Sequence, residues 1–109
     1  MALFTASPGA AGSVTNEASG GSYARAAVTN NSTNWPASSG GVKSNGTAIT
    51  FTTATASWSS GTNMTDAAIW DSLSASTNEL YYGTLTTAKP VLSGDTASFA
   101  SSALSVTVS

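Results

Sequence analysis

The chain contains no histidine and no cysteine, and only three basic and five acidic side chains occur among its 109 residues. Most enzymes need an activated nucleophile, a tunable acid or base, or metal ligands, and histidine is the side chain that titrates nearest neutral pH. The missing cysteines also exclude disulfides as a source of stability. The composition therefore predicts a structural or binding protein with no catalytic residue, no cofactor and no metal site.

The small number of basic side chains and the lack of a long apolar run argue against two kinds of partner, nucleic acids and membranes. Arg25, Lys43 and Lys89 are the only basic side chains, too few for one copy to neutralise several phosphates. No stretch approaches the ~18 consecutive apolar residues that span a bilayer, and residues 1–11 lack the basic start and apolar run of a signal peptide. We expect no nucleic-acid partner and no membrane partner.

The residues that are present predict a folded chain. Hydrophobic residues make up 40% of the sequence and include three tryptophans, whereas charged residues make up 7%, far below the usual share of about 25%. Disordered chains have the opposite balance. The length suits one domain over residues 1–109, and a surface with so few charges has little repulsion to keep copies apart.

Alternating apolar and β-branched residues favour strands, and no segment has the 3.6-residue period of a helix. The predicted strands are residues 2–7, 23–29, 49–58, 64–70, 80–85, 90–92, 97–99 and 104–108. Loops are predicted at residues 10–21, 30–46 and 71–78, and a turn at residues 93–95. About seven to nine short strands with turns between them predict an all-β fold, either an antiparallel β-sandwich or a jelly-roll-like barrel.

The alternation also predicts which side chains are buried. In residues 23–29, we expect Ala24, Ala26 and Val28 to face the core, with Tyr23 and Arg25 on the opposite face. Trp35 is expected to anchor the loop at 30–46. The whole predicted core comprises Val28, Ile49, Phe51, Trp58, Ile69, Leu85, Phe99, Leu104 and Val106.

Three kinds of functional site compete with simpler roles for the carboxylates and serines of the chain. A pair drawn from Asp66, Asp71, Glu79 and Asp95 could serve glycoside hydrolysis, and Asp95 could contribute to a calcium site. Turn capping and solvated strand ends explain these carboxylates better. The serines have no histidine and no Ser-x-x-Lys arrangement to activate them.

The aromatic residues could form a platform for sugars. Trp58 and Trp70 lie in strand-like runs, where packing in the core is the usual role, so Trp35 is the better candidate for an exposed contact. The other members of such a platform would be Tyr81 and Tyr82. Threonine pairs at residues 50/52 and 84/86 could match ice, but they do not form a repeat.

Six segments in order resemble a family of small virion proteins of tailed bacteriophages, often labelled tail fibre or minor structural proteins. They are residues 17–25 (EASGGSYAR), 43–51 (KSNGTAITF), 53–58 (TATASW), 67–71 (AAIWD), 80–86 (LYYGTLT) and 93–100 (SGDTASFA). The resemblance covers nearly the whole chain. It implies a virion location and no catalytic residues.

The resemblance also implies two local features. One is a structural role for Tyr23 and Arg25, because the several N–H donors of an arginine guanidinium can bind carbonyls or a carboxylate. Relatives are expected to carry a helix-forming segment before the strand that begins here at Ala2.

Two virion roles and one other role follow from these observations. The leading hypothesis is a capsid decoration (cement) protein that packs against the major capsid protein, because low charge, small size and many hydroxyl groups suit repeated packing. The alternative is a tail-fibre or tail-tip component that associates with tail proteins and binds the host surface. Outside the virion, the chain would be a carbohydrate-binding module or an ice-binding protein.

Self-association is expected in either virion role. The apolar Leu3 and Phe4 near the start of the chain and Trp35 in its loop are the candidate subunit contacts, together with the loops at residues 10–21 and 30–46. The predicted assembly is a symmetric homo-oligomer such as a trimer.

Overall fold

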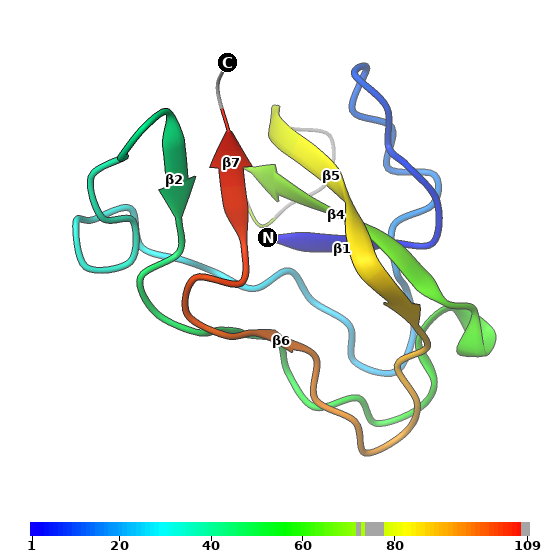
Figure 1. The fold of residues 1–109 in the computed structure, drawn as a ribbon. Helices are drawn as coiled ribbons and strands as arrows, with labels where there is room; N and C mark the ends of the chain where they lie inside the picture. Colours follow the sequence, from blue (N-terminus) through cyan, green and yellow to red (C-terminus); the bar gives the residue numbers. More distant parts are fainter. Residues whose placement is uncertain (72, 74–77, 108–109) are drawn as a thin grey trace.

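The computed structural model describes residues 1–71, 73 and 78–107, and the regular structure of this part is almost entirely β-structure (Figure 1). Its strands are β1 (Ala2–Phe4), β2 (Val42–Ser44), β3 (Ile49–Thr50), β4 (Met64–Trp70), β5 (Glu79–Lys89), β6 (Ser98–Phe99) and β7 (Ser105–Thr107). The element η1 (Trp58–Gly61) is a tight turn in which Ser59 and Ser60 have positive φ angles of 50° and 55°. No helix of the described part is long and apolar enough to cross a membrane. The predicted all-β class is confirmed.

The strands form three small antiparallel sheets. One sheet has the order β1-β4-β5, and the other two pair β2 with β7 and β3 with β6 (Figure 1). Apart from β4 and β5, which are neighbours in the sequence, each pair joins segments that are far apart in the sequence. This arrangement is compatible with the predicted β-sandwich.

β4 is the centre of the largest sheet and is apolar on both faces. Successive residues of a strand point to opposite faces, so Ala67, opposite Leu3 in β1, faces one side and Ala68, opposite Ala2, faces the other. The first face belongs to the main core, and the second belongs to a smaller cluster with Phe4 and Trp70. Packing on both faces explains why β4 is buried along most of its length.

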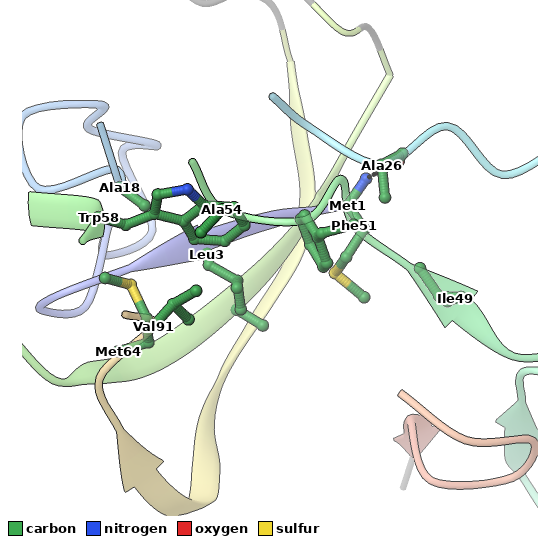
Figure 2. Close-up of a cluster of buried hydrophobic side chains, with 11 residues drawn as sticks. Met1, Leu3, Ala18, Ala26, Ile49, Phe51, Ala54, Trp58, Met64 and Val91 are labelled. Atoms are coloured by element: carbon green, nitrogen blue, oxygen red, sulfur yellow. Dashed lines mark hydrogen bonds between the residues drawn. The ribbon is translucent and has the colours of Figure 1, made fainter. Parts of the chain in front are cut away.

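Three aromatic rings lie at the centre of the main core. Trp58 has no exposed surface, and its ring meets those of Tyr23 and Phe51 edge-on, with centroids 5.0 and 6.1 Å away. The Trp58 indole Nε1 donates a hydrogen bond of 3.0 Å to the Gly21 carbonyl. Figure 2 shows Trp58 among the smaller core side chains. The buried members are Met1, Leu3, Ala18, Ala26, Ile49, Phe51, Ala54, Trp58, Met64, Ala67 and Val91.

Most of the predicted core is confirmed. Ile49, Phe51 and Trp58 are buried. Five more are partly buried and pack against the main core: Val28, Ile69, Leu85, Phe99 and Leu104. The side chain of Val106 lies outside the described residues, as do parts of the loop predicted at 71–78 and of the strand predicted at 104–108.

The strand predicted at residues 23–29 is wrong. This segment is irregular, and its alternation fails because Arg25 is buried while Ala24 is exposed. Arg25 turns inward to reach a carboxylate, and the backbone N–H of Ala26 bonds the Met1 carbonyl at 3.0 Å. Specific side-chain and backbone partners therefore override the expected two-residue period.

The strands predicted at residues 49–58 and 90–92 are shorter than expected or absent. Only Ile49–Thr50 is a strand, although the N–H groups of Phe51 and Ala54 still bond the carbonyls of Ala97 and Asp95. Trp58 begins η1 instead of continuing an extended run. No strand forms at residues 90–92, where Val91 is buried nevertheless. Burial was predicted better here than regular hydrogen bonding.

Asn45 connects the loop after β2 to the last segment of the chain. It has no exposed surface. Its Nδ2 donates 2.9 Å bonds to the carbonyls of Thr47 and Ala100, and its Oδ1 accepts a 2.9 Å bond from the Leu104 N–H. One side chain thus replaces part of a sheet ladder between residues 45–47 and 100–104.

Candidate functional site

The exposed surface of β5 is the most unusual feature of the described residues. The large apolar side chains that are exposed among the described residues are Val42, Leu73, Leu80, Tyr81, Tyr82 and Leu92. Three of them are consecutive on β5, and we call Leu80, Tyr81 and Tyr82 the β5 strip. Apolar side chains gathered on a surface often mark an interaction site.

The β5 strip exists because β5 lies at the margin of its sheet. Tyr81 and Tyr82 are paired with Ile69 and Ala68 of β4, and aromatic side chains favour strands. β4 is the strand that pairs with β5 within the described residues, and about half of each tyrosine remains exposed (51% and 46%). Consecutive strand residues face opposite sides, so the two rings do not form one flat platform.

Two hollows adjoin the strip. The larger has a volume of about 810 Å³ and lies between β4–β5 and the segment around residues 97–105. The smaller has about 340 Å³ and is lined by Trp35, Val28 and Leu73 among others. Tyr81 lines both hollows, so it stands at the junction of the two concave surfaces.

The candidate contacts Leu3 and Phe4 are placed differently from the prediction. Their exposed fractions are 3% and 0%, so the expectation that they are exposed is wrong. Pairing with β4 and the apolar clusters on both faces of the sheet bury β1. Trp35 is partly buried, packs against the main core as the predicted anchor of its loop, and lines the smaller hollow.

A polar network that is largely buried lies next to β1. The Arg25 Nε and Nη2 donate to Glu17 Oε2 and Oε1, both at 2.8 Å, and the Tyr23 hydroxyl donates to Oε2 at 2.8 Å. The Leu3 N–H donates to the Tyr23 oxygen at 3.2 Å, and the guanidinium carbon lies 4.6 Å from the Trp70 ring centroid. These contacts confirm the predicted structural role of Tyr23 and Arg25.

The network changes the proton affinity of its members. Burial alone would raise the pKa of Glu17, but hydrogen bonds from Arg25 and Tyr23 and the charge of Arg25 outweigh it and lower this pKa. The hydrogen bond to Glu17 raises the pKa of Arg25, and burial raises that of the Tyr23 phenol. The network is therefore a fixed ion pair rather than an acid–base centre near neutral pH.

Acid is expected to weaken the fold through Glu17. The pKa of Glu17 in the folded state is below its ordinary value of 4.5. The ionised carboxylate therefore stabilises the folded state fully above pH 4.5, and this stabilisation is lost as the pH falls through the folded-state pKa. Burial raises the pKa of Glu79, which opposes this trend. Urea unfolding of the wild type between about pH 3 and 7 would measure the fall in the free energy of unfolding.

Glu17→Gln provides the control for this prediction. At neutral pH it is expected to cost about 2–3 kcal/mol, because charged hydrogen bonds to Arg25 are lost while an amide oxygen can still accept from Tyr23. The variant should lose most of the fall in stability below pH 4.5. Equal acid sensitivity in both proteins would contradict the assignment to Glu17.

The remaining aspartates have local partners. Asp66 accepts bonds from the hydroxyls of Thr65 and Thr84, and Asp71 accepts two bonds from Asn78. Asp95 accepts from the Leu92 N–H at 3.0 Å, as predicted for a turn. No group of three or more potential metal-ligating side chains occurs within residues 1–71, 73 and 78–107.

The model of the family described as Podophage GP4 fiber I protein gp80 matches residues 1–107. The chain belongs to this family. No curated protein and no solved structure matches the chain. The gp80 family membership confirms the resemblance to phage structural proteins and the predicted virion location.

Because the gp80 family is named for a fibre protein, the surfaces that contact other subunits are the relevant candidate sites. Sequence reasoning selected Leu3, Phe4 and Trp35 as contacts and missed the β5 strip. The available signal was the pair Tyr81 and Tyr82 beside Gly83, because two large consecutive residues of a strand need cover on both faces. If too few other elements pack on the sheet to cover both of its faces, at least one of the two tyrosines remains exposed.

Proposed function

We propose that this chain is a non-enzymatic structural subunit of a virion fibre, which associates with other copies and with other virion proteins. The match of nearly the whole chain to a fibre protein family carries the proposal. The β5 strip supports it, since its three apolar side chains are exposed and available for contacts with other subunits. The hydrogen-bonded carboxylates support a non-enzymatic role, because they serve the fold.

Capsid decoration is the second candidate. It is favoured by the low charge of the chain, 7% of residues with a net charge of −2, which suits close packing of many neutral copies on a lattice. Both roles use the chain as a structural subunit. They differ in where it lies and in how many copies each particle holds.

A reconstruction of the virion tests the two roles. We expect density that fits the sheet β1-β4-β5 in a fibre, with few copies per particle. Hundreds of copies spread over the head would replace the fibre role by capsid decoration. Absence of the chain from purified particles, checked by mass spectrometry, would overturn both.

A further inference from the structure

Asn45 is followed by Gly46, and this pair makes Asn45 the most reactive asparagine of the unfolded chain. The backbone nitrogen after an asparagine can attack the side-chain carbon Cγ, and the ring that forms is a succinimide. A side chain on the following residue hinders this attack, and glycine has none. The other asparagines all precede larger residues: Asn16, Asn30, Asn31, Asn34, Asn63 and Asn78. The sequence therefore singles out Asn45 for loss of its amide.

The atoms of this reaction balance without a cofactor. The Gly46 nitrogen bonds to Asn45 Cγ, the bond from Cγ to Nδ2 breaks, and Nδ2 leaves as ammonia with the proton of the Gly46 N–H. Water then opens the succinimide at one of its two carbonyl carbons. The products are aspartate and isoaspartate, in which the main chain runs through the former side chain. Both carry a negative charge at neutral pH, and no oxidant or reductant is consumed.

The fold requires glycine after Asn45. A Cβ atom on Gly46 would collide with the Thr33 carbonyl oxygen and would lie 2.9 Å from two ring carbons of Pro36. The Gly46 N–H donates a 2.6 Å hydrogen bond to the Asn34 carbonyl of the same loop. The close approach of this loop therefore excludes the larger residues that would slow the reaction.

The folded chain blocks each step of the reaction. Asn45 has no exposed surface, so neither hydroxide nor water reaches its amide. The leaving Nδ2 donates to the carbonyls of Thr47 and Ala100, and Oδ1 accepts from the Leu104 N–H, all at 2.9 Å. The N–H of the attacking nitrogen is bonded as well, to the loop carbonyl. The reaction therefore has to wait for local or global unfolding of this segment.

We propose that Asn45 is a deamidation site that folding protects, and that its reaction in an unfolded copy removes that copy from the folded population. An ionised aspartate has no N–H donor, so the carbonyls of Thr47 and Ala100 would face a buried carboxylate. A buried charge without a partner is strongly unfavourable. An isoaspartate also adds one carbon atom to the main chain, which moves Gly46 out of the space that fits it.

This inference goes beyond the proposed function and does not depend on it. Copies that fold promptly keep the amide of Asn45, whether they enter a fibre or cover a head. Copies that stay unfolded lose the ability to fold, and with it the ability to assemble. Absence of the chain from virions would overturn the proposed function and leave this inference untouched.

Deamidation rates of the folded and unfolded wild type test the protection. The protein is incubated at mildly alkaline pH with and without guanidinium chloride, and mass spectrometry of proteolytic fragments locates the converted residue. In guanidinium chloride, Asn45 should react at least tenfold faster than Asn63, which precedes Met64. In the folded protein, Asn45 should react at least tenfold more slowly than in the unfolded protein. Equal rates for Asn45 in both states, or an unfolded rate no higher than that of Asn63, overturn the inference.

Refolding of a partly converted sample tests the loss of folding. After the guanidinium chloride is removed, size-exclusion chromatography separates folded from misfolded chains, and circular dichroism identifies the folded fraction. The ratio of intact to converted Asn45 should be at least tenfold higher in the folded fraction. The same ratio in both fractions overturns the inference.

Asn45→Asp produces the aspartate form without incubation. Asn63→Asp is the matched control, because it makes the same change of charge at an exposed side chain. We expect the control to unfold near the wild-type midpoint in guanidinium chloride. Asn45→Asp should unfold at a lower midpoint or show no folded spectrum. Equal midpoints for the two variants overturn the inference.

Discussion

Replacing Trp58 by alanine is expected to lower the free energy of unfolding by about 4–6 kcal/mol. Loss of a buried tryptophan costs roughly 3–5 kcal/mol, and its hydrogen bond to the Gly21 carbonyl adds about 1 kcal/mol. The ring also contacts Tyr23 and Phe51, so the cavity would open at the meeting point of three segments. A loss of this size is comparable to the whole stability of many domains, about 5–15 kcal/mol.

Urea unfolding followed by circular dichroism measures this loss. Trp35→Ala is the matched control, because Trp35 is only partly buried at the margin of the same core. The decrease in the free energy of unfolding caused by Trp35→Ala should be less than half of that caused by Trp58→Ala. Equal losses would show that burial in the main core does not set the contribution of Trp58.

Asn45→Ala is expected to cost about 3–6 kcal/mol, since each buried hydrogen-bonding group left without a partner costs roughly 1–3 kcal/mol. The carbonyls of Thr47 and Ala100 and the Leu104 N–H all lose the Asn45 side chain. The effect should be local as well as global. Hydrogen exchange of the Leu104 amide should accelerate more than that of β4 amides.

Asn34→Ala is the control for this change. Asn34 also bonds backbone and side-chain atoms, but it is partly exposed, and water can replace its partners. We expect it to cost about 1 kcal/mol. If Asn45→Ala costs no more than Asn34→Ala, the role of Asn45 as the connection to the last segment is refuted.

The fold was predictable where local pattern and tertiary packing agree. Residues 64–70 were predicted as a strand and form β4, because apolar residues on both faces meet partners on both faces. Residues 23–29 show the opposite case, since Arg25 follows the carboxylate of Glu17 rather than its strand position. The pairing of distant segments is not encoded by any local period.

The candidate site was less predictable than the fold. Leu3 and Phe4 were expected to be exposed because they stand near the chain start, yet β4 and two apolar clusters bury them. The exposure of Tyr81 and Tyr82 depends on β5 being the last strand of its sheet. Strand order is a property of the whole chain, so a strand sequence alone gives no indication of it.

The distant pairing of the strands has a consequence for how the chain reaches its fold. Ala2 pairs with Ala68, and Val42 pairs with Thr107, so neither β1 nor β2 finds its partner until most of the chain has been synthesised. Small proteins dominated by such non-local pairings fold over about milliseconds to seconds, more slowly than helical ones. β4 and β5 are neighbours in the sequence, so their pairing closes the shortest loop of any strand pair in the described residues. We therefore expect β4 and β5 to pair first and β1 to be added to them afterwards.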